Sequence, residues 1–278
     1  MRYLFFILSL SYTLLSFGSI PNVYSRSMPH PHQFIEVFHG KLPIILETPH
    51  GGYETIPGFS TNPRLGYRDS FTLELTRLIR EKMILKTGNS PEVVSMLASR
   101  NYIDVNRNPG PQAYTTEYTK ILYNLYYRNI DNAIKRVVKQ FGTGLMVSIH
   151  CGWNMRYEIE IGVNHVERWS TIPTFLKKYS WETFHGTDGI GGRLSQLGYQ
   201  VPGFNGVPRT GGWTGIPALT RCRKEQNIGV DGMMFEFWAK KLMSDAPKRE
   251  KLANDLAEVL IAFVNKYYSP IQQNEHNQ

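Results

Sequence analysis

Short apolar runs alternate with longer amphipathic segments along this chain, and this alternation restricts it to an α/β fold. The runs Leu42–Thr48, Glu92–Leu97 and Leu145–Ile149 have the length and composition of buried strands. Apolar residues at helical spacing fill the intervals Ser70–Lys86 and Thr115–Phe141. Strands separated by helices predict a three-layer sandwich, in which helices cover both faces of a mixed, mainly parallel sheet.

The same alternation continues to the C-terminus. Tyr157–Val163 and Met233–Trp238 are predicted strands, Thr174–Phe184 and Gly191–Leu197 are predicted short helices, and Lys248–Tyr267 has the pattern of an amphipathic closing helix. The segment Pro202–Pro217 is rich in Gly and Pro, which predicts an ordered loop over the site. Tyrosines at helical spacing between residues 114 and 127 are predicted to serve in packing.

The N-terminus has the pattern of a secretory signal peptide. Arg2 precedes an apolar run from Tyr3 to Ile20, and small residues occupy the minus-three and minus-one positions of a cleavage site after Ser25. We therefore expect a signal peptide over residues 1–25, a single domain over 26–278, and a secreted or periplasmic product. The alternative is an uncleaved membrane anchor, because the run is nearly long enough to cross a bilayer.

The net charge and the two cysteines bear on the possible partners of the chain and on disulfide formation. The formal net charge is +8, yet no basic run is interleaved with aromatic residues, so we expect no nucleic-acid partner and no membrane contact after cleavage. Two cysteines, Cys151 and Cys222, permit one disulfide or two buried thiols.

Polar residues stand at or near the carboxyl ends of the predicted strands, where α/β folds bind their ligands. His50 follows the first strand, Arg100 the second, His150 ends the third, and Glu236 lies in a late one. Ligands of open α/β sheets bind at the carboxyl ends of strands, so these four side chains are predicted to converge. Glu236 stands between Phe235 and Phe237, and a carboxylate in such a strand costs free energy unless it is paired or functional.

The residues around His50 suggest a metal site. His50 and Glu54 lie on one glycine-rich loop, and imidazole and carboxylate are ligands that zinc prefers. His150 is the natural third ligand, which leaves a fourth position open. The alternative is that His50 is a hydrogen-bonded turn residue and His150 a core residue. A Cys151–His150 hydrolase is disfavoured because neighbouring strand residues point to opposite faces.

Three further motifs resemble known zinc hydrolases. Asp104-Val105-Asn106-Arg107-Asn108 resembles the Asp-x-Asn-Arg-Asn stretch of zinc carboxypeptidases, and Ser148-Ile149-His150 and Phe235-Glu236-Phe237 are similar to their last-ligand and base strands. The Pro-His-Gly-Gly opening at Pro49 and the Ser-Arg before the Asp-x-Asn-Arg are more similar to the N-formylglutamate amidohydrolase family of the same fold.

This resemblance implies a zinc carboxypeptidase-like fold and a division of roles among the residues. Glu236 would be the general base, Arg100 the oxyanion stabiliser, and Asn106 with Arg107 the clamp for a substrate carboxylate. The competing explanation for Arg107 is an ion pair with Asp104. Many amidohydrolases of this type lack a Glu at position 54, so Asp69 is a rival to Glu54 as the carboxylate ligand of Zn²⁺.

Three functions follow as hypotheses. The first is a secreted zinc-dependent amidohydrolase that cleaves a small N-acyl amino acid, similar to N-formylglutamate, or a short acidic peptide. The second is a carboxypeptidase-like or poly-glutamate peptidase. The third is a non-catalytic secreted binding protein on the same fold.

Overall fold

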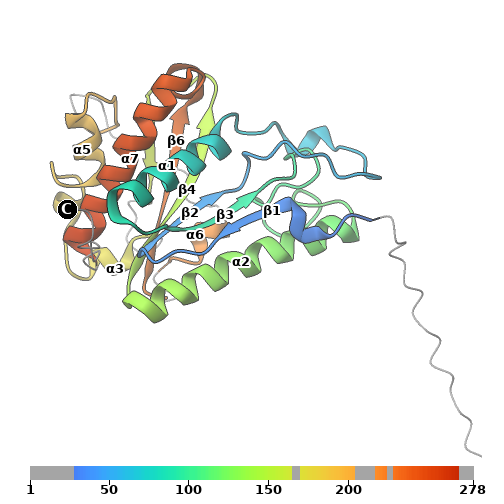
Figure 1. The fold of residues 1–278 in the computed structure, drawn as a ribbon, viewed down its shortest axis with the longest axis horizontal. Coiled ribbons are helices and arrows are strands. Elements are labelled where there is room, and N and C mark those ends of the chain that lie inside the picture. The colour runs from blue at the N-terminus through green and yellow to red at the C-terminus, as the bar shows by residue number, and fades with distance from the viewer. Residues whose placement is uncertain (1–27, 165–169, 204–216, 224–227, 269–278) are drawn as a thin grey trace, which may run out of the picture.

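A mixed six-stranded sheet forms the centre of the molecule (Figure 1). The structure is a computed structural model and describes residues 28–164, 170–203, 217–223 and 228–268. The strand order is β1-β3-β2-β4-β6-β5; the four inner strands run parallel, and both edge strands pair antiparallel with their neighbours. The strands are β1 (Ile35–Phe38), β2 (Ile44–Thr48), β3 (Glu92–Met96), β4 (Gly144–Gly152), β5 (Ile159–Gly162) and β6 (Val230–Trp238).

Helices cover both faces of this sheet, so the predicted three-layer α/β fold is confirmed (Figure 1). Helices α1 (Thr72–Thr87) and α7 (Ala246–Tyr267) bury their apolar side chains on one face. Helix α2 (Glu117–Phe141) covers the other. Helices pack on both faces of the sheet because the inner strands are apolar on both sides. Ile44 and Leu46 face α1, whereas Ile45 faces α2.

Smaller elements complete the layers. The predicted helical segment Thr174–Phe184 is divided into two short helices, and the predicted helix Gly191–Leu197 is present within one residue of its bounds. The signal segment 1–25 and most of the predicted Pro202–Pro217 loop lie outside the described residues. The remaining helices are η1 (Pro31–Phe34), η2 (Pro63–Leu65), α3 (Pro173–Leu176), α4 (Trp181–Phe184), α5 (Ile190–Gln196), α6 (Pro217–Thr220) and the π-helical turn η5 (Ala239–Met243).

The sheet reverses its direction of growth between β2 and β4. From β2 the chain passes through α1 to β3 on one side, and then through α2 to β4 on the other side of β2. Such a switch point leaves a crevice at the carboxyl ends of the two strands, because the connecting helices lie on opposite faces. His50 follows β2 and His150 lies near the end of β4, so both reach this crevice.

Two glycines let the chain turn directly after β2. A Cβ on Gly52 would lie 2.2 Å from the carbonyl oxygen of Leu97, the residue that follows β3. The residues after Gly52 pair with this end of β3, where the Glu54 N–H donates to Leu97 O at 2.9 Å. Only glycine allows this close approach of the two backbones.

Gly52→Ala is expected to lower the free energy of unfolding by about 1–3 kcal/mol, because the new methyl group overlaps a backbone oxygen that has no flexible end to give way. Chemical denaturation measures the change. Thr55→Ala in the exposed part of the same loop is the control and should stay within about 0.5 kcal/mol of the parent. Equal stability of Gly52→Ala and the parent would contradict the packing.

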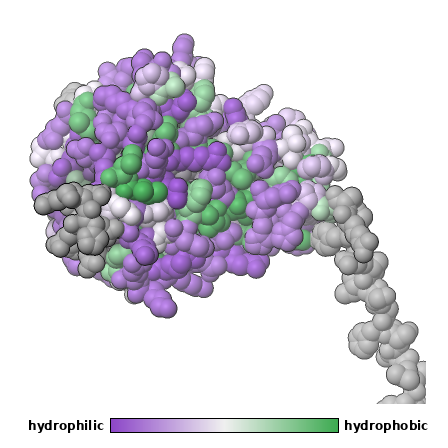
Figure 2. Space-filling view, viewed as in Figure 1, coloured by the Kyte–Doolittle hydropathy of each residue, from purple (hydrophilic) through white to green (hydrophobic). Residues whose placement is uncertain are grey.

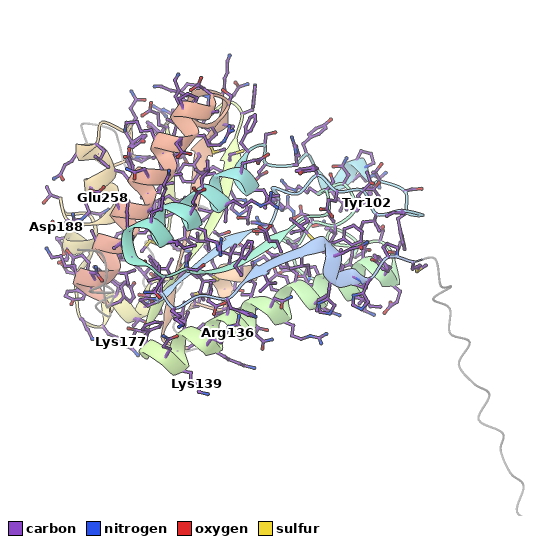
Figure 3. All side chains as sticks on the ribbon, in the orientation of Figure 1. Tyr102, Arg136, Lys139, Lys177, Asp188 and Glu258 are labelled. Carbon is purple, nitrogen blue, oxygen red and sulfur yellow. The ribbon has the colours of Figure 1, made fainter. Side chains whose placement is uncertain are left out.

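The face of the molecule seen in Figure 2 is mostly hydrophilic, with smaller hydrophobic areas near its centre. Charged side chains of the helices lie at the periphery, among them Arg136, Lys139 and Lys177 (Figure 3). Arg136 pairs with Glu92 at 2.7 Å, which fits a scattered basic surface better than a continuous basic track. Cys151 and Cys222 are both free thiols. None of the helices in the described ranges has the length and apolar character needed to cross a membrane.

Candidate metal centre and active site

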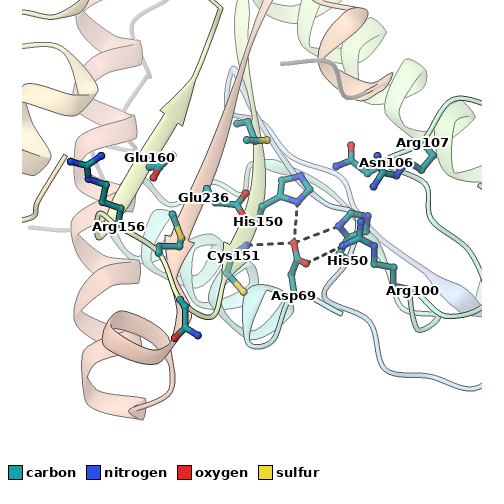
Figure 4. A pocket seen from close by; sticks show the side chains of 13 residues that line it. His50, Asp69, Arg100, Asn106, Arg107, His150, Cys151, Arg156, Glu160 and Glu236 are labelled. Carbon is teal, nitrogen blue, oxygen red and sulfur yellow. Dashed lines mark hydrogen bonds and ion pairs between the residues drawn. The ribbon is translucent and has the colours of Figure 1, made fainter. Parts of the chain in front are cut away.

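His50, Asp69 and His150 meet in the crevice between β2 and β4 (Figure 4). Asp69 Oδ2 lies 3.0 Å from His150 Nδ1 and 3.5 Å from His50 Nδ1. All three residues are buried, and one potential ligand atom from each lies within 4.8 Å of the others. The structure therefore brings together the two predicted histidines with a carboxylate between them.

Each imidazole also has a hydrogen-bond partner at Nε2, the ring nitrogen that does not face Asp69. His50 Nε2 lies 2.7 Å from Asp104 Oδ1, and His150 Nε2 lies 3.0 Å from Ser148 Oγ. Burial alone would raise the pKa of Asp104, but His50 and Arg100 hold it at about 2, so Asp104 is ionised and can only accept. His50 must then carry a hydrogen on Nε2, so Nδ1 is the nitrogen that can offer a lone pair to a cation.

The three atoms that face one another suit a cation. His50 Nδ1 is buried without a hydrogen-bond partner among the described residues, and it points at a carboxylate. Burial lowers the pKa of His50, yet Asp69 and Asp104 outweigh burial and raise it. Burial likewise opposes ionisation of Asp69, but the two histidines hold the pKa of Asp69 well below its usual range. The site thus favours added positive charge, and two nitrogens with one oxygen are a donor set that fits Zn²⁺ with one open position.

Glu54 lies apart from this cluster. Its backbone extends the pairing of β2 with β3, because Glu54 N–H donates to Leu97 O and Glu54 O accepts from Ser99 N–H. The charges that act on Glu54 are Arg77 and Glu36. Asp69 returns to the crevice instead, since its N–H donates to His50 O at 2.9 Å. The geometry therefore favours Asp69, the rival in the sequence analysis, as the carboxylate ligand.

Glu236 lies one strand away from His150 on the same side of the sheet. His150 pairs with Glu236 in the β4–β6 ladder, and Glu236 pairs with Glu160 in the β5–β6 ladder. Phe235 and Phe237 face the α1–α7 core, so alternation along β6 turns Glu236 towards the crevice. Burial is the main reason that the pKa of Glu236 is raised, and the charge of Asp69 raises it further.

Cys151 is directed away from the histidines. It packs against the α1–α7 core, and its Sγ donates to Ser70 O at 3.2 Å. Burial raises the pKa of the Cys151 thiol, with the charge of Asp69 as a further cause. The thiol therefore lacks the thiolate character of a nucleophile, and its direction agrees with the prediction that Cys151 and His150 point to opposite faces.

Arg100 binds the acidic residues around His50. Its Nε and Nη2 donate to Asp104 Oδ2 at 3.0 and 2.9 Å, and its Nη1 donates to Tyr67 O at 3.3 Å. Nη1 also lies 3.5 Å from Asp69 Oδ1. These contacts fix the carboxylates of Asp104 and Asp69, and the oxyanion role of Arg100 stays a prediction.

Asn106 and Arg107 lie at the mouth of the crevice on a loop held by α2. Asn106 N–H donates to Asp104 Oδ1 at 2.9 Å, and Tyr123 Oη donates to Arg107 O at 2.8 Å. Arg107 Nε lies 3.5 Å from Asp104 Oδ2, but the Arg107 side chain remains 56% exposed. Its guanidinium is thus anchored at one nitrogen and open to a ligand.

A pocket of about 640 Å³ contains these groups, a size typical of small-molecule sites. Asn106 and Arg107 lie at one end and Arg156 and Glu160 at the other, with the histidines and Glu236 between them (Figure 4). Several lining residues were not predicted from the sequence, because nothing in their local pattern marks them. These residues are Asn154, Met155, Arg156, Glu160 and Met234.

Two solved structures share this architecture. The crystal structure of N-formylglutamate amidohydrolase from Ralstonia eutropha JMP134 aligns with a TM-score of 0.58 at 14% identity, over 84% of this chain and 98% of that one. The crystal structure of a gene product from Agrobacterium tumefaciens aligns with a TM-score of 0.57 at 17% identity, over 84% and 95%. The chain has their fold.

The structural resemblance to N-formylglutamate amidohydrolase predicted from the motifs is therefore confirmed. At these identities the likeness extends to the fold alone. No protein-family model matches the sequence, and no curated protein matches it.

Proposed function

We propose that this chain is a secreted zinc-dependent amidohydrolase that cleaves the amide bond of a small acidic N-acyl amino acid or short acidic peptide. One observation carries the proposal: His50 Nδ1, His150 Nδ1 and Asp69 Oδ2 converge in a buried crevice, next to the otherwise unexplained carboxylate of Glu236. His50, Asp69 and His150 are the residues that would hold Zn²⁺.

Bound zinc supplies Lewis acidity, which polarises a substrate carbonyl and makes water more acidic. Glu236 takes a proton from the attacking water and delivers it to the nitrogen of the leaving amine. The raised pKa of Glu236, caused mainly by its burial, suits this role because the carboxyl can bind and release a proton closer to neutral pH. In this scheme Arg100 keeps Asp104 and Asp69 in place, and Arg100 also remains the candidate for stabilising the oxyanion.

Recognition of an acidic substrate falls to Arg107 and Asn106. The half-exposed guanidinium of Arg107 offers the planar donors that match a carboxylate, and it lies in the same pocket as the proposed zinc ligands. The volume of the pocket supports a small substrate. A substrate similar to N-formylglutamate fits this chemistry, and the fold neighbour of that name supports the choice.

Arg107→Ala is expected to lower kcat/KM for an acidic substrate by roughly 10–100-fold, the range of a lost hydrogen bond to a charged group. The same variant should change little for an analogue whose carboxylate is blocked as an amide. Lys139→Ala removes one positive charge at the periphery, outside the pocket, and is the control (Figure 3). Equal losses for the acidic and the blocked substrate would contradict the role of Arg107.

Metal content and substrate choice test the proposal together. We expect about one equivalent of zinc after mild purification, and hydrolysis of N-formyl-glutamate that stops on chelation and returns with zinc. Less than about half an equivalent, with no binding of added zinc, would overturn the metal site. Preference for C-terminal peptide substrates over N-formyl-glutamate would favour a carboxypeptidase-like enzyme, and zinc binding with no hydrolysis of either would favour a binding protein.

Secretion forms a separate part of the proposal. It rests on the basic start, apolar run and small residues of segment 1–25. N-terminal sequencing of the exported protein should begin at Arg26, and an intact Met1 on a membrane-bound product would favour the anchor. Neither nucleic acid nor membrane is proposed as a partner of the cleaved chain.

A further inference from the structure

A buried glutamate lies beneath the proposed metal site. Glu47 on β2 is only 1% exposed, and no Lys, Arg or His of the described residues pairs with it. A buried carboxylate is costly unless hydrogen bonds compensate for its lost hydration. Both oxygens are in fact used: Tyr126 Oη donates to Oε1 at 2.5 Å, and Ser148 Oγ donates to Oε2.

Tyr126 closes this network on the side of α2. Burial raises the pKa of Tyr126 well above its usual value, and the charge of Glu47 raises it further, so the phenol keeps its proton and donates. The hydroxyl of Ser148 has one hydrogen, which is committed to Glu47 Oε2. The two hydroxyls therefore leave Glu47 as an acceptor only.

The direction of the Ser148 hydrogen bond decides where His150 carries its proton. Ser148 Oγ lies 3.0 Å from His150 Nε2, and because its hydrogen points to Glu47 it can only accept from the imidazole. His150 must then carry a hydrogen on Nε2, so Nδ1, which lies 3.0 Å from Asp69 Oδ2, is the nitrogen whose lone pair a cation can bind in place of the hydrogen that Nδ1 otherwise donates to Asp69. Asp104 imposes the same arrangement on His50.

We propose that Glu47 is a positioning residue that, through Ser148, fixes His150 in the state that presents a lone pair to the cation. The proposal rests on the proposed function only in giving that lone pair a zinc ion to bind. Residues that orient metal-binding histidines contribute strongly to affinity, and here the carboxylate acts through one intervening hydroxyl.

Glu47→Gln reverses the hydrogen-bond direction. The amide oxygen accepts from Tyr126, so the amide NH₂ faces Ser148 and donates to it. Ser148 must then give its hydrogen to His150 Nε2, so Nε2 has no acceptor for the hydrogen that it must carry when Nδ1 binds a metal. We expect zinc affinity to fall roughly 10–100-fold, as for other residues that orient metal ligands.

Tyr126→Phe is the matched control. It removes one hydrogen bond from the same carboxylate but leaves the path Glu47–Ser148–His150 intact. Its zinc affinity should stay near that of the parent even if its melting temperature falls. Ser148→Ala breaks the path at its middle, and it should reproduce the loss of affinity if Glu47→Gln does not fold.

Two readouts test the proposal. Competition with a chromophoric chelator gives zinc affinity, and ¹⁵N chemical shifts of the imidazole in the metal-free protein, assigned by their absence in His150→Gln, report whether Nε2 carries a hydrogen. Loss of the hydrogen on Nε2 in Glu47→Gln but not in Tyr126→Phe supports the proposal. Unchanged His150 shifts in Glu47→Gln, or equal affinity losses in both variants, overturn it. A parent protein that binds no zinc refutes the proposed function instead, and the metal-free shifts still decide the role of Glu47.

Discussion

Replacing Glu236 with Gln is expected to abolish most amide hydrolysis while zinc remains bound. The Gln side chain has nearly the same shape, but it cannot take a proton from water. Losses of roughly 10²–10⁴-fold in kcat are typical when a general base is removed. Zinc is expected to stay because His50, Asp69 and His150 form the proposed ligand set without Glu236. Metal analysis and steady-state kinetics on the same sample measure both quantities.

Glu160→Gln provides the matched control for this prediction. Glu160 lines the same pocket and pairs with Glu236 across the β5–β6 ladder, so it is a second carboxylate in a similar place. Burial raises the pKa of Glu160 as well. A larger loss of turnover in Glu160→Gln than in Glu236→Gln would move the role of base to Glu160. Full activity of Glu236→Gln would show that Glu236 is not the base.

The inner strands could be predicted because strands that are buried on both faces consist largely of consecutive apolar residues. β2 and β4 are apolar on consecutive residues, and both were predicted within a few residues of their bounds. β1 was not predicted, because this four-residue edge strand has only one residue that is fully buried. A short edge strand forms by pairing with a neighbouring strand, here β3. The residues of the edge strand have no pattern of their own that predicts this pairing.

The positions of His50, His150 and Glu236 at strand ends could be predicted for a related reason. The carboxyl ends of parallel strands meet at one edge, so a polar residue placed there is brought to the same crevice regardless of its separation in sequence. The carboxylate between the histidines could not be settled in this way. Asp69 reaches them through a backbone hydrogen bond to His50 O after a loop that the local pattern does not define.

The hydrogen bonds that packed side chains donate also could not be predicted from the sequence. The helical spacing of Tyr123, Tyr126 and Tyr127 predicts burial, and the three residues are buried. Their hydroxyls additionally donate to Arg107 O, Glu47 and Val105 O. A tyrosine therefore packs through its ring and positions the site through its hydroxyl, and periodicity reports only the first of these.

Asp69→Asn is expected to remove most zinc binding, whereas Glu54→Gln is expected to leave it unchanged. Asp69 lies between His50 and His150, and the charges acting on Glu54 come from Arg77 and Glu36. Zinc sites with four ligands bind with about 10–16 kcal/mol, so one ligand accounts for roughly a 10²–10³-fold change in affinity. The amide of Asn keeps the volume of Asp69 but loses the charge that offsets the metal.

Competition titration gives the affinities, and melting curves with and without zinc give an independent measure, because a ligand that binds only the folded state raises its melting temperature. The parent and Glu54→Gln should both be stabilised by added zinc, and Asp69→Asn should not. The reverse pattern would make Glu54 the ligand and would require the loop after β2 to turn Glu54 away from Leu97 and Ser99. Loss of zinc in both variants would mean that the two carboxylates act together, Glu54 through the loop that carries His50.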